Sequence, residues 1–199
     1  MSDRQTPEER KAAGKALRKD VPRSSHGDWS PASDRPDPVD VITSQDEDRV
    51  QWLVPIRHGR MSESPFAFYR GAAKVMATDL ASTPSSGLEA QLCGDAHLAN
   101  FGSYASPDRR QVFDVNDFDE TLPGPWEWDL KRLAASFVLA GRDNGFGDKT
   151  TRRITEQSVA AYRQSMATFA ASRTLDVWYS QISLQDIADA TPKKKDRKR

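Results

Sequence analysis

The stretch Gly94-Asp95-Ala96-His97-Leu98-Ala99-Asn100 is followed, after one short segment, by Asn116-Asp117-Phe118-Asp119. An aspartate thus precedes an asparagine by five residues, and a second acidic group comes after an apolar run. Mg²⁺ prefers oxygen ligands and takes only one or two from protein carboxylates, the rest coming from phosphate and water. Two such ligands on adjacent strands, with an acidic base on the loop between them, meet that requirement. The spacing therefore predicts a magnesium site beside a general base.

Each polar residue of this stretch has a candidate role in phosphoryl transfer, because kinase-type enzymes use the same Asp, Asn and Asp order. Asp95 is the candidate general base, and Asp117 is the candidate chief metal ligand. Asn100 would complete the metal site, with Asp119 as a further ligand. His97 is a candidate to contact a phosphate or to orient Asp95. The alternative is structural, because Gly, Asp and Asn are common in turns and a loop histidine is more often only a hydrogen-bonding residue.

Three longer segments carry a resemblance: RMSESPFAFYRGAA, QLCGDAHLANFGSYASPDR and VFDVNDFDETLPGPWEWDLKRLAASFVLAGRDNGF. Over about residues 50–180 they resemble DUF2252, a bacterial family that is similar in motif to aminoglycoside and choline kinases. The resemblance implies an α+β fold, the mostly helical catalytic-lobe half of a protein-kinase-like fold, with a small β-hairpin carrying the catalytic loop. It also implies Mg²⁺ or Mn²⁺, ATP as co-substrate and a small-molecule hydroxyl as acceptor. Asp129, in Trp128-Asp129-Leu130, resembles an aspartate that supports the catalytic loop in such kinases.

The nucleotide-binding elements of a kinase are not found in the expected place. No G-x-G-x-x-G precedes Gly94, and Lys74 lies on a predicted helix. In DUF2252 proteins, as the resemblance implies, a glycine-rich segment and a lysine-bearing strand follow the catalytic half. We therefore expect a truncated, N-terminal half that binds ATP weakly and self-associates through the surface left by the missing lobe. The sequence leaves open whether this short form is active or inactive.

Composition narrows the class of protein. The 199 residues contain 29 Lys and Arg against 29 Asp and Glu, so the formal net charge is zero, whereas nucleic-acid-binding domains usually carry a positive excess. No apolar run approaches the roughly 20 residues that cross a bilayer, and the N-terminal segment lacks the apolar core of a secretory signal. We expect a cytoplasmic protein without membrane or nucleic-acid partners. The single cysteine, Cys93, is expected to be a small buried strand residue rather than a nucleophile.

Three regions are predicted along the chain: a disordered or loosely packed segment at 1–43, a catalytic half at 44–188 and a basic flexible tail at 189–199. Within the first, Thr6-Pro7-Glu8-Glu9 predicts a capping box and a short helix. The expected elements of the second are a helix from a capping box at Ser44 towards Pro55, a helix from Ser64-Pro65 to Leu80, strands at 88–93 and 110–115, a chain break at TLPGP, a helix from Trp126 or Glu127, and helices at 148–172 and 175–188.

Several cations lie before the motif, namely Arg57, His58, Arg60 and Arg70. Guanidinium groups beside a phosphate site would orient an anionic substrate, and Arg70 is the candidate for nucleotide contact. The alternative is that these side chains are solvated or pair with nearby acids.

Three functions remain open from the sequence. The first is an ATP-dependent phosphotransferase. The second is a metal-dependent phosphohydrolase that uses Asp95, His97, Asp114, Asp117 and Asp119 around one or two metals. The third is a non-enzymatic remnant that binds a partner through apolar surface.

Overall fold

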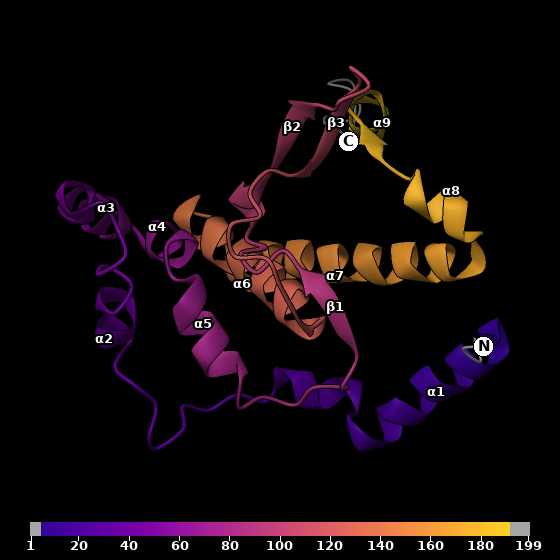
Figure 1. The fold of residues 1–199 in the computed structure, drawn as a ribbon, viewed down its shortest axis with the longest axis horizontal. Helices are drawn as coiled ribbons and strands as arrows, with labels where there is room; N and C mark the ends of the chain where they lie inside the picture. Colours follow the sequence, from indigo (N-terminus) through magenta and orange to yellow (C-terminus); the bar gives the residue numbers. More distant parts are fainter. Residues whose placement is uncertain (1–4, 192–199) are drawn as a thin grey trace.

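The computed structural model describes residues 5–191 and has an α+β architecture, as expected (Figure 1). Most of the predicted basic tail lies outside these residues. The elements in chain order are α1 (Pro7–Asp20), η1 (Arg23–Gly27), α2 (Pro38–Thr43), η2 (Gln51–Leu53), α3 (Val54–Met61), α4 (Pro65–Arg70), α5 (Ala73–Leu80), β1 (Glu89–Leu92), η3 (Leu98–Asn100), β2 (Phe101–Ala105), β3 (Gln111–Val115), β4 (Leu122–Pro125), α6 (Glu127–Asp143), α7 (Asp148–Ala171), α8 (Thr174–Trp178), β5 (Ile182–Ser183) and α9 (Leu184–Ala190).

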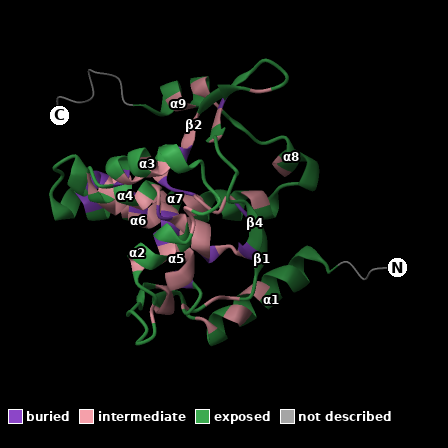
Figure 2. Ribbon diagram, turned by 60° about the vertical axis from the view of Figure 1, so that its left-hand side comes forward, coloured by how far each residue is buried: buried purple, intermediate pink, exposed green. Residues whose placement is uncertain are grey.

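The pair α6 and α7 forms the centre of the fold, and the sequence predicted both helices (Figure 1). The two helices approach closely near their connecting turn. A Cβ atom on Gly141 would lie 2.7 Å from the Thr151 hydroxyl oxygen, so only glycine fits there without a shift. The most deeply buried residues gather on α6, including Arg132 at 2% and Ser136 at 0% exposure. Figure 2 shows the buried positions concentrated around α6, while α1 is largely exposed.

Two small antiparallel sheets carry the loops of interest. β1 pairs with β4, and β3 lies between β2 and β5. The 88–93 and 110–115 strands were predicted, but the expectation that TLPGP only breaks the chain was wrong. Leu122–Pro125 pairs with β1 in register, Leu92 opposite Leu122. Proline is tolerated in such a strand because this sheet has only two strands, and each therefore has a free edge.

The helices before β1 depart from the prediction in two places. The box at Ser44 does not open a helix; Ser44 instead follows the last residue of α2. The helix predicted from Ser64 does begin there, with the Ser64 hydroxyl accepting the Ala67 N–H. It breaks at Gly71, because the Gly71 Cα packs against the Met61 side chain, where a Cβ would lie 2.6 Å from sulfur, and its carbonyl accepts from Arg57.

The chain ends are less closely packed than the centre. The Thr6 capping box is confirmed, and α1 buries none of its residues. The following segment, residues 21–37, which we call the strap, crosses to α5 and is attached there by an Arg35–Asp79 ion pair of 2.5 Å. The helix predicted at 175–188 was wrong, because α8, β5 and α9 replace it, with β5 paired to β3. Within residues 5–191 no helix combines the length and apolarity needed to span a bilayer.

Candidate functional site

A polar cavity of about 220 Å³ lies where the loops after β1 and β3 meet the segment around α3 and α4. Three of the predicted site residues line it, Asp95, Asp117 and Asp119, together with Glu120. The predicted nucleotide contact Arg70 also lines it. The structure thus brings together four of the six predicted site residues; the other two, His97 and Asn100, lie beneath the cavity.

Asp95 is held by a buried arginine that the sequence analysis did not identify. Arg132, on α6, donates to Asp95 Oδ1 from Nε at 2.6 Å and Nη2 at 2.5 Å. Its Nη2 also donates to the Tyr69 carbonyl at 2.8 Å, and its guanidinium lies 4.4 Å from the centre of the Tyr69 ring. The Tyr69 hydroxyl in turn donates to the Arg132 carbonyl, and burial raises the pKa of Tyr69 to about 12. Asp95 Oδ1 is therefore occupied, and Oδ2 is the carboxylate oxygen left for other contacts.

Asp129 supports the loop that carries Asp95. Its two carboxylate oxygens accept the backbone N–H groups of Cys93 at 2.7 Å and Gly94 at 3.1 Å. Burial raises the pKa of Asp129, although these two hydrogen bonds act in the opposite direction. Gly94 has φ of +83°, and a Cβ there would overlap the Glu120 carbonyl oxygen. The supporting role expected of Asp129 is therefore present in the structure.

Asn100 joins the two loops below the cavity. Its side-chain N–H₂ donates to the backbone carbonyls of Asp95 at 2.9 Å and Asp117 at 3.1 Å. Its side-chain oxygen accepts the Asp117 N–H at 3.0 Å. The residue is only 6% exposed. In this arrangement Asn100 fixes the spacing of the two aspartates.

The two aspartates after β3 have exposed carboxylates on the cavity wall. Asp117 Oδ1 accepts the Asp119 N–H at 3.0 Å, which leaves Asp117 Oδ2 without an intramolecular partner in the described part of the chain. Asp119 accepts no hydrogen bond among residues 5–191. The same residues contain no preformed group of three or more His, Cys, Asp or Glu side chains disposed as metal ligands.

His97 lies beneath Asp95 and not on the cavity wall. It is 7% exposed, with Nε2 at 3.6 Å from Asp95 Oδ2 and Nδ1 buried without a partner in residues 5–191. Burial lowers the pKa of His97 against the opposing effect of the Asp95 charge, and Arg132 also lowers it. Burial therefore favours the neutral form of the imidazole, with one ring nitrogen directed at the Asp95 carboxylate.

Three arginines also line the cavity, Arg49, Arg57 and Arg70. Arg57 is part-buried, donates from Nη2 to the Gly71 carbonyl at 2.6 Å, and has a buried Nη1 without a partner in the described chain. Burial and the nearby Arg49 lower the pKa of Arg57. A guanidinium with an unsatisfied N–H can bind an anion, since charged hydrogen bonds to phosphate are among the stronger ones. The other predicted cations, His58 and Arg60, do not line the cavity, and His58 pairs with Asp46 at 3.1 Å.

Sequence reasoning missed two buried residues that support the motif, Arg132 and Ser136. Ser136 Oγ accepts the Leu98 N–H at 2.9 Å, so it holds the segment after Asp95 against α6. The available signal was their position on α6, three and seven residues after Asp129. A polar side chain at that spacing, on the helix stripe that faces the loop, needs a partner in the interior.

The comparisons with known proteins give a family but no activity. No curated protein and no solved structure matches the chain. Residues 49–199 match the family described as "Uncharacterized protein conserved in bacteria (DUF2252)". That match includes every residue of the polar cavity except Gln45. The chain therefore belongs to the DUF2252 family.

Proposed function

We propose that the chain carries the metal-binding and base-bearing site of a kinase-like phosphotransferase, which transfers phosphate from ATP to a small-molecule hydroxyl. The observation that supports it best is the polar cavity, which Asp95, Asp117 and Asp119 line together with three arginines. Phosphoryl transfer requires carboxylates that hold the metal and act as the base, and it requires cations that bind the phosphate.

Asp95 is the proposed base. The transition state of phosphoryl transfer is loose, so the task of the base is to orient the acceptor hydroxyl rather than to remove its proton early. A base for this purpose must be fixed in position. Asp95 meets this condition because Arg132 holds Oδ1, Asp129 holds the preceding backbone and Asn100 holds its carbonyl. Oδ2 would accept the hydrogen bond of the acceptor.

The cavity suits a hard divalent cation in its donor chemistry. Asp117 and Asp119 offer carboxylate oxygens at the cavity wall, and Mg²⁺ needs only one or two of these. When bound, the ion would neutralise phosphate charge and orient the transferred group. Asn100 as a further ligand stays a prediction: its oxygen already accepts the Asp117 N–H and would have to serve both partners.

The arginines are the proposed phosphate contacts. Four carboxylates and three guanidinium groups line the cavity, so the arginines alone do not offset the acids and a triphosphate. Anion binding is therefore expected to depend on the cation. Of the three, Arg57 has the buried N–H that lacks a partner, and it is the contact we expect to matter most.

The phosphohydrolase alternative is not supported by the positions of its residues. It needs His97 and Asp114 as ligands beside the three aspartates. His97 lies below the cavity wall with its ring buried, and Asp114 is an exposed residue of β3 that does not line the cavity. We therefore keep the phosphotransferase as the proposed function.

The first test measures metal binding. Calorimetric titration with Mn²⁺ is compared between the wild type, Asp117→Asn and the control Asp114→Asn, which removes an exposed acid three residues earlier. We expect at least tenfold weaker binding for Asp117→Asn and no change for the control. Equal affinity in all three proteins would refute the assignment of Asp117, and a selective loss in Asp119→Asn would transfer the role to Asp119.

The second test measures turnover with MgATP at millimolar concentration and a panel of small hydroxyl compounds, water included. Asp95→Asn should lower phosphate release or transfer by a factor of about a hundred while leaving Mn²⁺ affinity unchanged. Unchanged turnover in Asp95→Asn would show that Asp95 is only a turn residue.

A further inference from the structure

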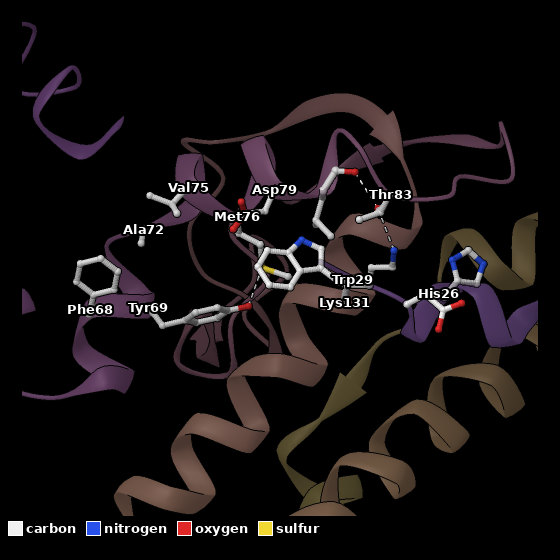
Figure 3. A pocket seen from close by; sticks show the side chains of 12 residues that line it. His26, Trp29, Phe68, Tyr69, Ala72, Val75, Met76, Asp79, Thr83 and Lys131 are labelled. Atoms are coloured by element: carbon white, nitrogen blue, oxygen red, sulfur yellow. Dashed lines mark hydrogen bonds between the residues drawn. The ribbon is translucent and has the colours of Figure 1, made fainter. Parts of the chain in front are cut away.

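A second cavity, of about 380 Å³, lies between the strap and helices α4 and α5, apart from the acidic loops (Figure 3). We call it the aromatic pocket. Its volume falls within the range of about 300–1,000 Å³ that is usual for small-molecule sites. The proposed phosphotransferase chemistry does not use it.

Aromatic rings line the pocket from two separate parts of the chain. Phe68 and Tyr69 come from α4, whereas Trp29 comes from the strap; in Figure 3 the Trp29 indole lies between Tyr69 and His26. Val75 and Met76, on α5, add aliphatic surface. Flat rings that line a cavity favour a flat ligand, because offset stacking adds to apolar burial.

The walls of the pocket are fixed by contacts outside it. The Tyr69 hydroxyl donates to the Arg132 carbonyl at 2.9 Å, and its oxygen lies 2.8 Å from the Met76 sulfur. On the strap, Arg35 pairs with Asp79 and lies 5.9 Å from the centre of the Trp29 ring. Trp29 is nevertheless 52% exposed. A ligand can bury more of this ring, and because the ring is already held in place, little side-chain entropy is lost on binding.

The polar groups of the pocket restrict the charge of the ligand. The Asp79 carboxylate is paired with Arg35, and the Lys131 ammonium donates to the Thr83 hydroxyl at 3.1 Å. By contrast, His26 Nδ1 is buried without a hydrogen-bond partner in residues 5–191. Asp28 also lines the pocket, and its carboxylate has no hydrogen bond or ion pair among residues 5–191. The pocket therefore disfavours an anion, and His26 offers the ligand one hydrogen bond.

We propose that the aromatic pocket binds a planar compound of about two fused rings that is not an anion and carries one hydrogen-bonding substituent. The rings would stack on Trp29, and the substituent would reach His26. This proposal is independent of the metal site, so it stands or fails separately from the proposed function.

The test uses 2-naphthol as the probe, with isothermal titration for affinity and saturation-transfer NMR for contact. We expect saturable one-to-one binding with a dissociation constant of about 0.1 mM, which is ordinary efficiency for a ligand of this size, unchanged by EDTA. Trp29→Ser should weaken binding about tenfold. The control Trp178→Ser removes a tryptophan that is 80% exposed on α8 and should change nothing.

A second variant separates loss of binding from loss of structure. Val75→Phe fills the cavity and should abolish 2-naphthol binding while the protein still unfolds cooperatively. His26→Leu should weaken binding about fivefold. Absence of saturable binding to the wild type, or equal affinity in wild type, Trp29→Ser and Val75→Phe, would overturn the proposal.

Discussion

Replacing Arg132 by methionine removes the cation that holds Asp95 and leaves the carboxylate without its partner. The Arg132 side chain is 3% exposed and that of Asp95 is 20% exposed. Breaking a buried pair by removing one partner costs about 3–5 kcal/mol, and because water reaches part of Asp95 we expect the lower end, about 3 kcal/mol. At about 2–4 °C per kcal/mol for a chain of this length, the melting temperature should fall by about 6–12 °C.

Urea unfolding followed by circular dichroism measures this cost, and a double-mutant cycle with Asp95→Asn measures the pairing itself. Methionine keeps most of the apolar stem but also removes the hydrogen bond to the Tyr69 carbonyl and the cation–π contact with the Tyr69 ring, so the cycle is needed to isolate the part due to Asp95. Adding Asp95→Asn to Arg132→Met should recover about 2 kcal/mol, since the unpaired charge disappears. The matched control is Arg142→Met, an exposed position on the same helix, which should stay within about 0.5 kcal/mol of wild type. A loss below about 1 kcal/mol, or strictly additive effects in the cycle, would refute the reasoning.

Three further outcomes are expected. Because His97 is buried, its pKa in the folded state lies below its ordinary value of about 6.5. The unfolded chain therefore takes up the proton more readily, and the free energy of unfolding falls as the pH drops below about 6.5. His97→Gln should flatten this fall in urea titrations between about pH 7.5 and 5. Asp129→Ala removes two charged acceptors of backbone N–H groups and should cost about 2–4 kcal/mol, against no measurable change for the exposed Asp143→Ala; a cost below about 1 kcal/mol would contradict the support role. MgATP should bind the 199-residue chain with a dissociation constant in the millimolar range or weaker, about 4 kcal/mol of binding free energy, and a low micromolar value by calorimetry would contradict this.

Local sequence signals predicted the elements that depend on local physics. The Thr6 box and the Ser64 cap follow from side chains that satisfy free backbone N–H groups, and both are present in the structure. The start of α6 was also predicted, although no side chain caps it. Ser44 carries the same type of signal but follows the end of a helix. The packing of α2 on α5 places the helix before Ser44 and not after it. A capping pattern shows what a residue can bind, not which of its neighbours is helical.

The candidate site, too, was only partly predictable from the sequence. The motif spacing placed three aspartates at one cavity, and the support by Asp129 was expected from resemblance. The role of Arg132 was not accessible, because its partners Asp95 and Tyr69 lie 37 and 63 residues away along the chain. Nothing in the local sequence distinguishes a buried arginine on an apolar stripe from one that extends into solvent.

The clasp made by Asn100 has a consequence for variation in chain length. The Asn116 N–H also donates to the Asn100 carbonyl at 2.9 Å, so the chain that leaves at Asn100 returns beside it. The residues between them form the β2–β3 hairpin, with its tip at 106–110, and Asn100 holds the two ends of this hairpin together. Insertions or deletions at that tip can change the length of the arm without changing the separation of Asp95 and Asp117. The tip is therefore where homologous chains can differ in length, and where a tag or a spectroscopic label can be added, without disturbing the acidic cavity.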